Sequence, residues 1–118
     1  MEDYMLGAVE SRFAAIVWEN APITTKELIK ICEKELGLKR TTTYTVLKKL
    51  SERGFFENQD GTVIVKLSKE EFYARQSQGY VERSFFGSLP SFLTAFTSGR
   101  KLSDKEIEEI KKIIENSK

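Results

Sequence analysis

Three helical patterns stand in a row at the start of this 118-residue chain, and an Asp-Gly turn between two β-branched runs follows them directly. Apolar side chains recur at helical spacing in residues 5–19, and Pro22 then breaks the pattern. Thr24 followed by Glu27 is a capping-box signature, which predicts the start of a second helix. A third helix is predicted over residues 40–53.

The hairpin pattern comes immediately after the third helix. Residues 55–57 and 62–67 are typical of two short strands, and residues 58–61, which end in Asp-Gly, are typical of the turn that joins them. Three helices followed by a hairpin is the order of a winged helix-turn-helix. We therefore expect a mainly α fold with a small β-hairpin: a winged helix-turn-helix DNA-binding domain over residues 1–67 and a helical region over residues 68–118.

The helical region carries more large apolar side chains than isolated, solvent-exposed helices would hold. These side chains either fold back and complete one core with the first domain, or pack against the same helices of a second chain. We favour the second arrangement, a homodimer, because a two-fold interface would place two recognition helices about 34–36 Å apart on DNA. The candidate dimerisation residues are Phe85, Phe86, Leu89, Phe92, Leu93, Phe96, Ile107, Ile110 and Ile114.

Basic charge is concentrated in the predicted third helix. The net charge of the whole chain is only +1, yet residues 39–53 carry five basic side chains against one acidic side chain. An α-helix fits the major groove of DNA, where threonine contacts base edges and lysine and arginine neutralise phosphates. The alternative is an ordinary solvated polar helix face. The candidate residues for binding double-stranded DNA are Lys39, Arg40, Thr41, Thr42, Tyr44, Thr45, Lys48, Lys49 and, on the returning strand, Lys66.

The composition argues against an enzyme. The chain has no histidine and a single cysteine, Cys32, so Ser-His and Cys-His nucleophilic pairs and Cys/His metal clusters are excluded. Cys32 is interpreted as a small apolar core residue, and no cofactor or metal is expected. No apolar run reaches membrane-spanning length, and the acidic start Met1–Tyr4 lacks the pattern of a signal peptide. We expect a cytoplasmic protein with no membrane partner.

Several stretches together resemble the penicillinase-repressor family, the BlaI/MecI/CopY group. They are Leu6-x3-Glu10-x7-Trp18, then Arg40-Thr41-Thr42-Thr43-Tyr44-Thr45-Val46-Leu47-Lys48-Lys49-Leu50-x3-Gly54-Phe55, then Phe86-Gly87-Ser88-Leu89, and finally Leu102-Ser103-x2-Glu106-Ile107-x2-Ile110. The resemblance covers nearly the whole chain and is carried by the order and spacing of these pieces.

The resemblance implies a homodimeric repressor that binds a palindromic operator, typically with a TACA/TGTA core. It implies that Thr42 and Thr45 contact bases and that the helices after the hairpin form the dimer. Members that govern β-lactam resistance are inactivated by a protease, commonly after an asparagine that precedes phenylalanine. This chain has Ala95-Phe96 at the matching bond, so it departs from the pattern of that protease partner. It also lacks the C-terminal cysteine cluster of the copper-responsive members.

Two other functions stay open from the residues alone. The near-neutral charge is also compatible with a winged-helix module that binds proteins and not DNA. The aromatic side chains Phe85, Phe86, Phe92 and Phe96 could line a pocket in a ligand-responsive regulator without protease control, although such clusters are more often plain core.

Overall fold

The computed structural model describes residues 4–118; residues 1–3, on which part of the expectation about a signal peptide rests, lie outside them. The chain forms two compact units, one that ends at Gly79 and one of residues Tyr80–Lys118. Helix α4 (Lys69–Phe85) contributes to both. The domain boundary predicted between residues 67 and 68 falls just before α4. That DNA binding belongs to residues 1–67 and dimerisation to residues 68–118 stays a prediction.

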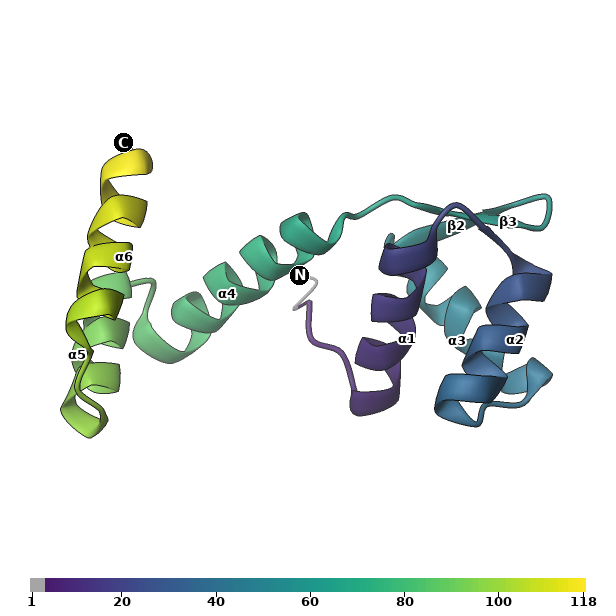
Figure 1. Ribbon diagram of the computed structural model, residues 1–118, viewed down its shortest axis with the longest axis horizontal. Helices are drawn as coiled ribbons and strands as arrows, with labels where there is room; N and C mark the ends of the chain where they lie inside the picture. The colour runs from purple at the N-terminus through teal and green to yellow at the C-terminus, as the bar shows by residue number, and fades with distance from the viewer. Residues whose placement is uncertain (1–3) are drawn as a thin grey trace. The chain divides into compact units, whose positions relative to one another are not determined.

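The first unit combines three helices with a small antiparallel sheet (Figure 1). The mainly helical, winged fold class predicted from the sequence is therefore confirmed. The strand order is β1-β3-β2. The elements in chain order are α1 (Ala8–Asn20), β1 (Ile23–Thr24), α2 (Thr25–Leu36), α3 (Arg40–Glu52), β2 (Phe56–Gln59) and β3 (Thr62–Val65).

The sheet differs from the prediction in two ways. Strand β1 was not predicted, because two residues next to Pro22 read as a break and not as a strand; Ile23 pairs with Val63 of β3. The turn is also shorter than predicted. Asp60 and Gly61 have φ values of 50° and 89°, so two residues close the hairpin, as a type I′ turn requires, and Asn58 belongs to β2.

Local capping fixes where the helices begin. Helix α1 begins at Ala8, later than the predicted residue 5, because Glu10 Oε1 accepts a hydrogen bond from the backbone N–H of Gly7. The hydroxyl of Thr24 accepts from the N–H of Glu27 at 3.1 Å, which confirms the predicted start of α2. Gly37, with φ of 66°, ends that helix in the left-handed region that glycine favours.

The core of the first unit lies between the helices and the inner side of the sheet. Phe13 of α1, Leu28 of α2, Leu50 of α3 and the pair Phe55-Phe56 are fully buried there. Cys32 is also fully buried, and burial raises the pKa of its thiol, as expected for a core residue and not for a reactive cysteine.

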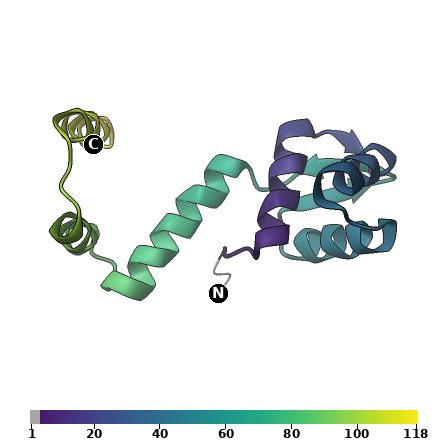
Figure 2. The ribbon, with the colours of Figure 1, turned by 60° about the horizontal axis from the view of Figure 1, so that its bottom comes forward.

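The second unit contains the end of α4, then α5 (Leu89–Gly99) and α6 (Asp104–Asn116). Ser88 and Ser103 cap the two helices through their hydroxyls, as their sequence patterns predicted. Figure 2, which looks nearly along both helices, shows α5 and α6 as separate coils joined by an extended loop. Neither helix contains a buried residue. No helix within residues 4–118 is long and apolar enough to cross a membrane.

Candidate nucleic-acid interface

Helix α3 has one buried side and one exposed side. Thr43, Leu47 and Leu50 are buried at its inner face, and the hydroxyl of Thr43 donates to the carbonyl oxygen of Lys39 at 3.1 Å. The other face projects threonine, tyrosine and basic side chains, followed at the last position of the helix by the exposed Glu52. The predicted DNA-binding residues that are exposed on or just before α3 are Lys39, Arg40, Thr41, Thr42, Tyr44, Thr45, Lys48 and Lys49. Helical periodicity thus brings eight of the nine predicted residues together.

Thr45 lies in the middle of this exposed face. Its hydroxyl donates to the carbonyl oxygen of Thr41 at 2.9 Å, one turn back along the helix. A threonine hydroxyl has one proton and two lone pairs. In this conformation the oxygen of Thr45 can therefore accept a hydrogen bond from a ligand, such as the exocyclic amine of adenine or cytosine in the major groove.

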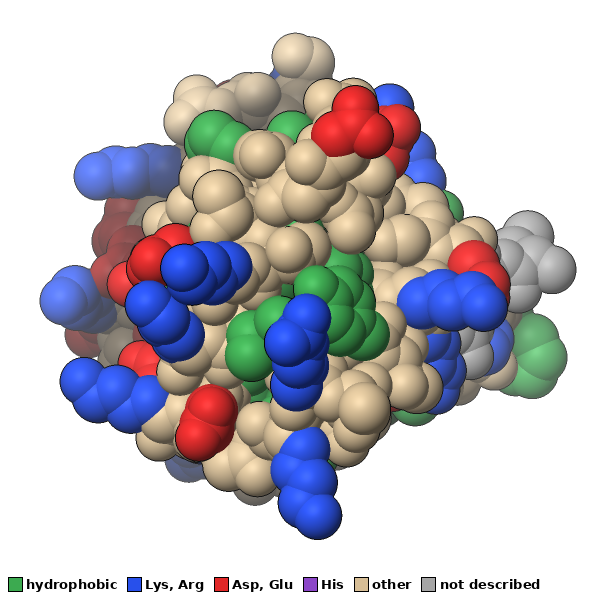
Figure 3. Space-filling view, turned by 90° about the vertical axis from the view of Figure 1, so that its right-hand side faces the viewer, with side chains coloured by type: hydrophobic (Ala, Val, Ile, Leu, Met, Phe, Trp, Pro, Cys, Tyr) green, Lys and Arg blue, Asp and Glu red, His purple; other side chains and the backbone are tan. Residues whose placement is uncertain are grey.

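A shallow groove of about 400 Å³ separates the start of α2 from the start of α3. The guanidinium of Arg40 lies 5.9 Å from the ring centroid of Tyr44, within cation–π distance. Figure 3 views this side of the molecule, where lysine and arginine side chains surround a small exposed apolar patch. The residues that line the groove are Thr25, Lys26, Ile29, Lys30, Arg40 and Tyr44.

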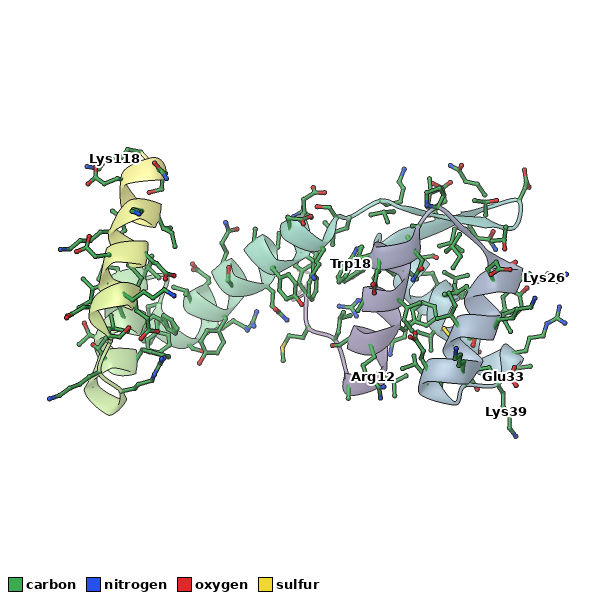
Figure 4. The ribbon with its side chains drawn as sticks, in the orientation of Figure 1. Arg12, Trp18, Lys26, Glu33, Lys39 and Lys118 are labelled. Carbon is green, nitrogen blue, oxygen red and sulfur yellow. The ribbon has the colours of Figure 1, made fainter. Side chains whose placement is uncertain are left out.

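Sequence reasoning missed the basic side chains of α2. Lys26, Lys30 and Lys34 repeat every four residues, so they share one side of a helix, and this spacing could have identified them. All three are exposed. Lys26 on α2 and Lys39 before α3 both extend outward from the helices (Figure 4). The basic surface is therefore wider than α3 alone.

Lys49 differs from the other basic residues of α3 because it has an ionic partner on α1. Its Nζ lies 3.2 Å from Oε2 of Glu10, and Nη1 of Arg53 lies 4.0 Å from the same oxygen. The N–H of Gly7 holds the pKa of Glu10 below its ordinary value, and Lys49 and Arg53 lower it further against the opposing effect of burial. The charge of Lys49 is thus partly offset within the protein.

Lys66, the predicted residue on the returning strand, lies just beyond β3. Its Nζ is 3.5 Å from Oε2 of Glu57 on the neighbouring strand, and the turn of the hairpin itself carries Asp60. The hairpin therefore contributes less positive charge than α2 and α3 do. No group of three histidine, cysteine or acidic side chains suited to a metal ion occurs within residues 4–118.

The predicted dimerisation residues form two apolar surfaces in the second unit. The first is a cluster of aromatic rings. The ring centroid of Phe92 lies 5.4 Å from that of Phe85 and 6.1 Å from those of Tyr80 and Phe96. Phe86 stands outside this cluster with 97% of its surface exposed. Leu89 is exposed and Leu93 is half-buried. Tyr80 is a member that the sequence analysis did not select.

The second apolar surface lies along α6. Ile107 and Ile110 are half-buried, whereas Ile113 and Ile114 are 66% and 49% exposed. Charged side chains occupy the other positions of the helix up to Glu115, as in the ion pair between Lys111 and Glu108, and Asn116 ends it. Helix α6 is therefore amphipathic, with an apolar side that the other residues of the second unit leave largely uncovered.

Two comparisons with known proteins bear on the family of this chain. Residues 6–116 match the family described as penicillinase repressor. The chain is 27% identical over 107 residues to the penicillinase repressor of Bacillus licheniformis, a match that covers 87% of this chain and 84% of that protein. It is 20% identical over 115 residues to the methicillin resistance regulatory protein MecI of Staphylococcus aureus, with 94% of each chain covered. The chain therefore belongs to the penicillinase repressor family, a family of winged-helix transcriptional repressors and not of enzymes.

Proposed function

We propose that this protein is a homodimeric repressor that binds a palindromic operator by inserting α3, residues 40–52, into the major groove of each half-site. The observation that carries the proposal is the composition of the exposed side of α3, where hydroxyl and basic side chains lie opposite a face buried by Thr43, Leu47 and Leu50. A solvated surface without a ligand has no need for three exposed threonines, Thr41, Thr42 and Thr45, in the first two turns of a helix, since threonine is a poor helix former.

In this proposal the threonines and the basic residues have different roles. Thr42 and Thr45 contact base edges, with Lys48 one turn further along the same side of α3. Lys39 and Arg40, at the start of α3, neutralise phosphates, and Lys26 and Lys30 extend the phosphate contacts across the groove to α2. Thr41 and Tyr44 complete the contact surface. Lys49 and Lys66 are weaker candidates, because each already has a carboxylate partner within 3.5 Å.

The exposed apolar side chains of the second unit support the proposal of a dimer. Among residues 4–118, no side chain of α5 or α6 is fully buried, although α5 carries Leu89, Leu93 and Phe96 and α6 carries four isoleucines. A two-fold interface uses the same surface on both copies, so one apolar surface suffices to bury both. The proposed interface residues are those predicted from the sequence, with Tyr80 added.

The bond between Ala95 and Phe96 lies inside α5, Leu89–Gly99. Proteolysis concentrates at exposed or locally unfolded backbone, so cleavage here would require α5 to open first. Control by an inactivating protease therefore depends on the stability of α5 in the dimer.

A repressor must reach the DNA that carries its operator. The proposed function therefore also implies a cytoplasmic protein.

The proposal is tested with the purified full-length protein. Sedimentation equilibrium gives its oligomeric state, and selection from a library of random duplexes followed by gel-shift titration gives its target and affinity. We expect a dimer, and an inverted repeat as the selected sequence. Binding to this repeat should be at least about 100-fold tighter than binding to random DNA, since specific DNA-binding proteins reach ratios of about 10³–10⁷.

Two threonine variants separate recognition from folding. Thr45→Ala on α3 should lower the preference for the selected repeat by about tenfold, as expected for the loss of roughly 1–3 kcal/mol of base discrimination. Thr94→Ala on α5 is the matched control, since the Thr94 hydroxyl makes the same kind of bond, 2.8 Å to the carbonyl oxygen of Pro90. The proposal would be contradicted if the protein is a monomer that does not bind duplex DNA in low salt. It would also be contradicted if Thr45→Ala and Thr94→Ala prefer the selected repeat over random DNA to the same extent.

A further inference from the structure

Both carboxylate oxygens of Glu10, on α1, have a partner. Oε1 accepts a hydrogen bond from the backbone N–H of Gly7 at 3.0 Å. Oε2 lies 3.2 Å from Nζ of Lys49, in the last turn of α3, and 4.0 Å from Nη1 of Arg53, which follows that helix. Glu10 therefore connects the start of its own helix to the C-terminal end of α3.

Within the ion pair, Glu10 is the fixed partner and Lys49 is the movable one. The side chain of Glu10 is only 18% exposed and is held by the N–H of Gly7, whereas the side chain of Lys49 is 63% exposed. A lysine ammonium lies at the end of a flexible four-carbon chain. Glu10 therefore determines where the ammonium of Lys49 lies, while that ammonium stays accessible to a competing anion.

Lys49 shares a side of α3 with threonines that are proposed to contact bases. It follows Thr45 by four residues and Thr42 by seven, and both spacings place side chains on one side of a helix. Lys48, one position earlier, is exposed and forms no ion pair with a carboxylate in the part of the chain that the structure describes. Two adjacent lysines thus offer a phosphate different amounts of uncompensated charge.

A carboxylate next to a phosphate-binding lysine lowers the affinity for DNA. Sequence-independent binding comes almost entirely from basic side chains that neutralise phosphates and release counterions. A phosphate that binds Lys49 must compete with Oε2 of Glu10, which is 3.2 Å from the ammonium. Arg53 does not replace Lys49 in this role, because its side chain is only 19% exposed and its Nη2 donates to the carbonyl oxygen of Met5.

We propose that Glu10 is a positioning residue that withholds the ammonium of Lys49 from DNA phosphates, and so limits the sequence-independent part of the affinity for DNA. This inference rests on the proposed function of α3. Phosphate contacts carry no direct base information, so Glu10 lowers the affinity for random DNA and for the operator alike. The preference for the operator then depends on the threonines of α3.

The test measures how salt affects binding of the full-length protein to two labelled duplexes, one of random sequence and one with the inverted repeat that the wild type selects. Glu10→Gln removes the charge, and its amide oxygen can still accept from the N–H of Gly7. Glu106→Gln is the matched control. Glu106 Oε1 accepts from the N–H of Ser103 at 3.1 Å, and its Oε2 lies 3.0 Å from Nη2 of Arg100, but α6 carries none of the predicted DNA-binding residues.

We expect Glu10→Gln to bind both duplexes more tightly than the wild type does. One phosphate contact is added per protomer, so the slope of log K against log salt should become steeper by about 2. The gain in affinity should therefore be about tenfold larger at 50 mM than at 200 mM KCl, with the same preference for the repeat. Glu106→Gln should keep the wild-type slope. A purely structural role of Glu10 predicts weaker binding, since α3 would be held less firmly.

The same substitution in a Lys49→Ala background shows whether Glu10 acts through Lys49. The steeper slope should not appear there, because no ammonium is left to release. The inference is overturned, and the proposed function stands, if Glu10→Gln binds no more tightly than the wild type or if its slope steepens equally without Lys49. A wild type that binds neither duplex would overturn the proposed function, and the inference with it.

Discussion

Replacing Lys26 by alanine tests whether the groove between α2 and α3 contacts DNA phosphates. Within residues 4–118, five basic side chains on this surface are exposed and form no ion pair with a carboxylate: Lys26, Lys30, Lys39, Arg40 and Lys48. A dimer that uses all of them makes about ten phosphate contacts, for which the slope of log K against log salt is about −9. Lys26→Ala removes one contact per protomer, so the slope should become about −7.

The difference is large enough to measure. Between 50 and 200 mM KCl the variant should lose about tenfold less affinity than the wild type. Fluorescence anisotropy with a labelled duplex gives the slope, and Lys112→Ala on α6 is the control, because it removes the same charge from an exposed lysine outside the proposed interface. Sequence preference should not change in either variant, since phosphate contacts carry no direct base information.

One result would refute this reasoning. If Lys26→Ala and Lys112→Ala have the same slope while the wild-type slope remains steep, the groove does not contact phosphate, and the basic residues of α3 alone carry the electrostatic attraction. A shallow wild-type slope would instead show that this surface is not used for DNA at all.

Two further predictions concern stability. Because the pKa of Glu10 is lowered in the folded state, its carboxylate stabilises the fold above pH 4.5, the ordinary pKa value, and this contribution is lost as the pH falls through the lower, folded-state pKa. The Tm difference between wild type and Glu10→Gln should therefore shrink below pH 4.5. A Tm difference that persists at pH 2 would contradict the prediction. Phe72→Ala should lower the free energy of unfolding in urea by about 3–5 kcal/mol, whereas Tyr73→Ala at the exposed neighbouring position should cost roughly 1 kcal/mol or less; equal losses would show that Phe72 does not anchor α4.

The exposed side of α3 could be predicted because it depends on local periodicity. With Leu47 and Leu50 assigned to the core, the 3.6-residue repeat places Thr41, Thr45 and Lys48 on the other side without any knowledge of the tertiary fold. The starts of α2, α5 and α6 were predictable for a similar reason, since a cap involves residues only three positions apart, whereas α1 begins three residues later than predicted.

Strand β1 and the groove were not predictable in this way. Two residues are too short to show the alternation that identifies a strand, and Ile23 becomes part of a sheet only because Val63 lies beside it. Lys26 and Lys30 form a surface with Arg40 only because α2 and α3 pack side by side. The lysine spacing on α2 indicated a shared side, but not what that side would adjoin.

The sequence by itself determined which segments are helical, the caps of α2, α5 and α6, the Asp-Gly pair of the turn and the side of α3 that meets solvent, because each depends on interactions between residues a few positions apart. Tertiary structure decided that Glu10 pairs with Lys49 across 39 positions and that Tyr4 bonds Arg75 across 71. Such pairs form only when the backbone has already folded. The sequence around a charged or hydroxyl side chain does not indicate which distant residue packing will bring next to it.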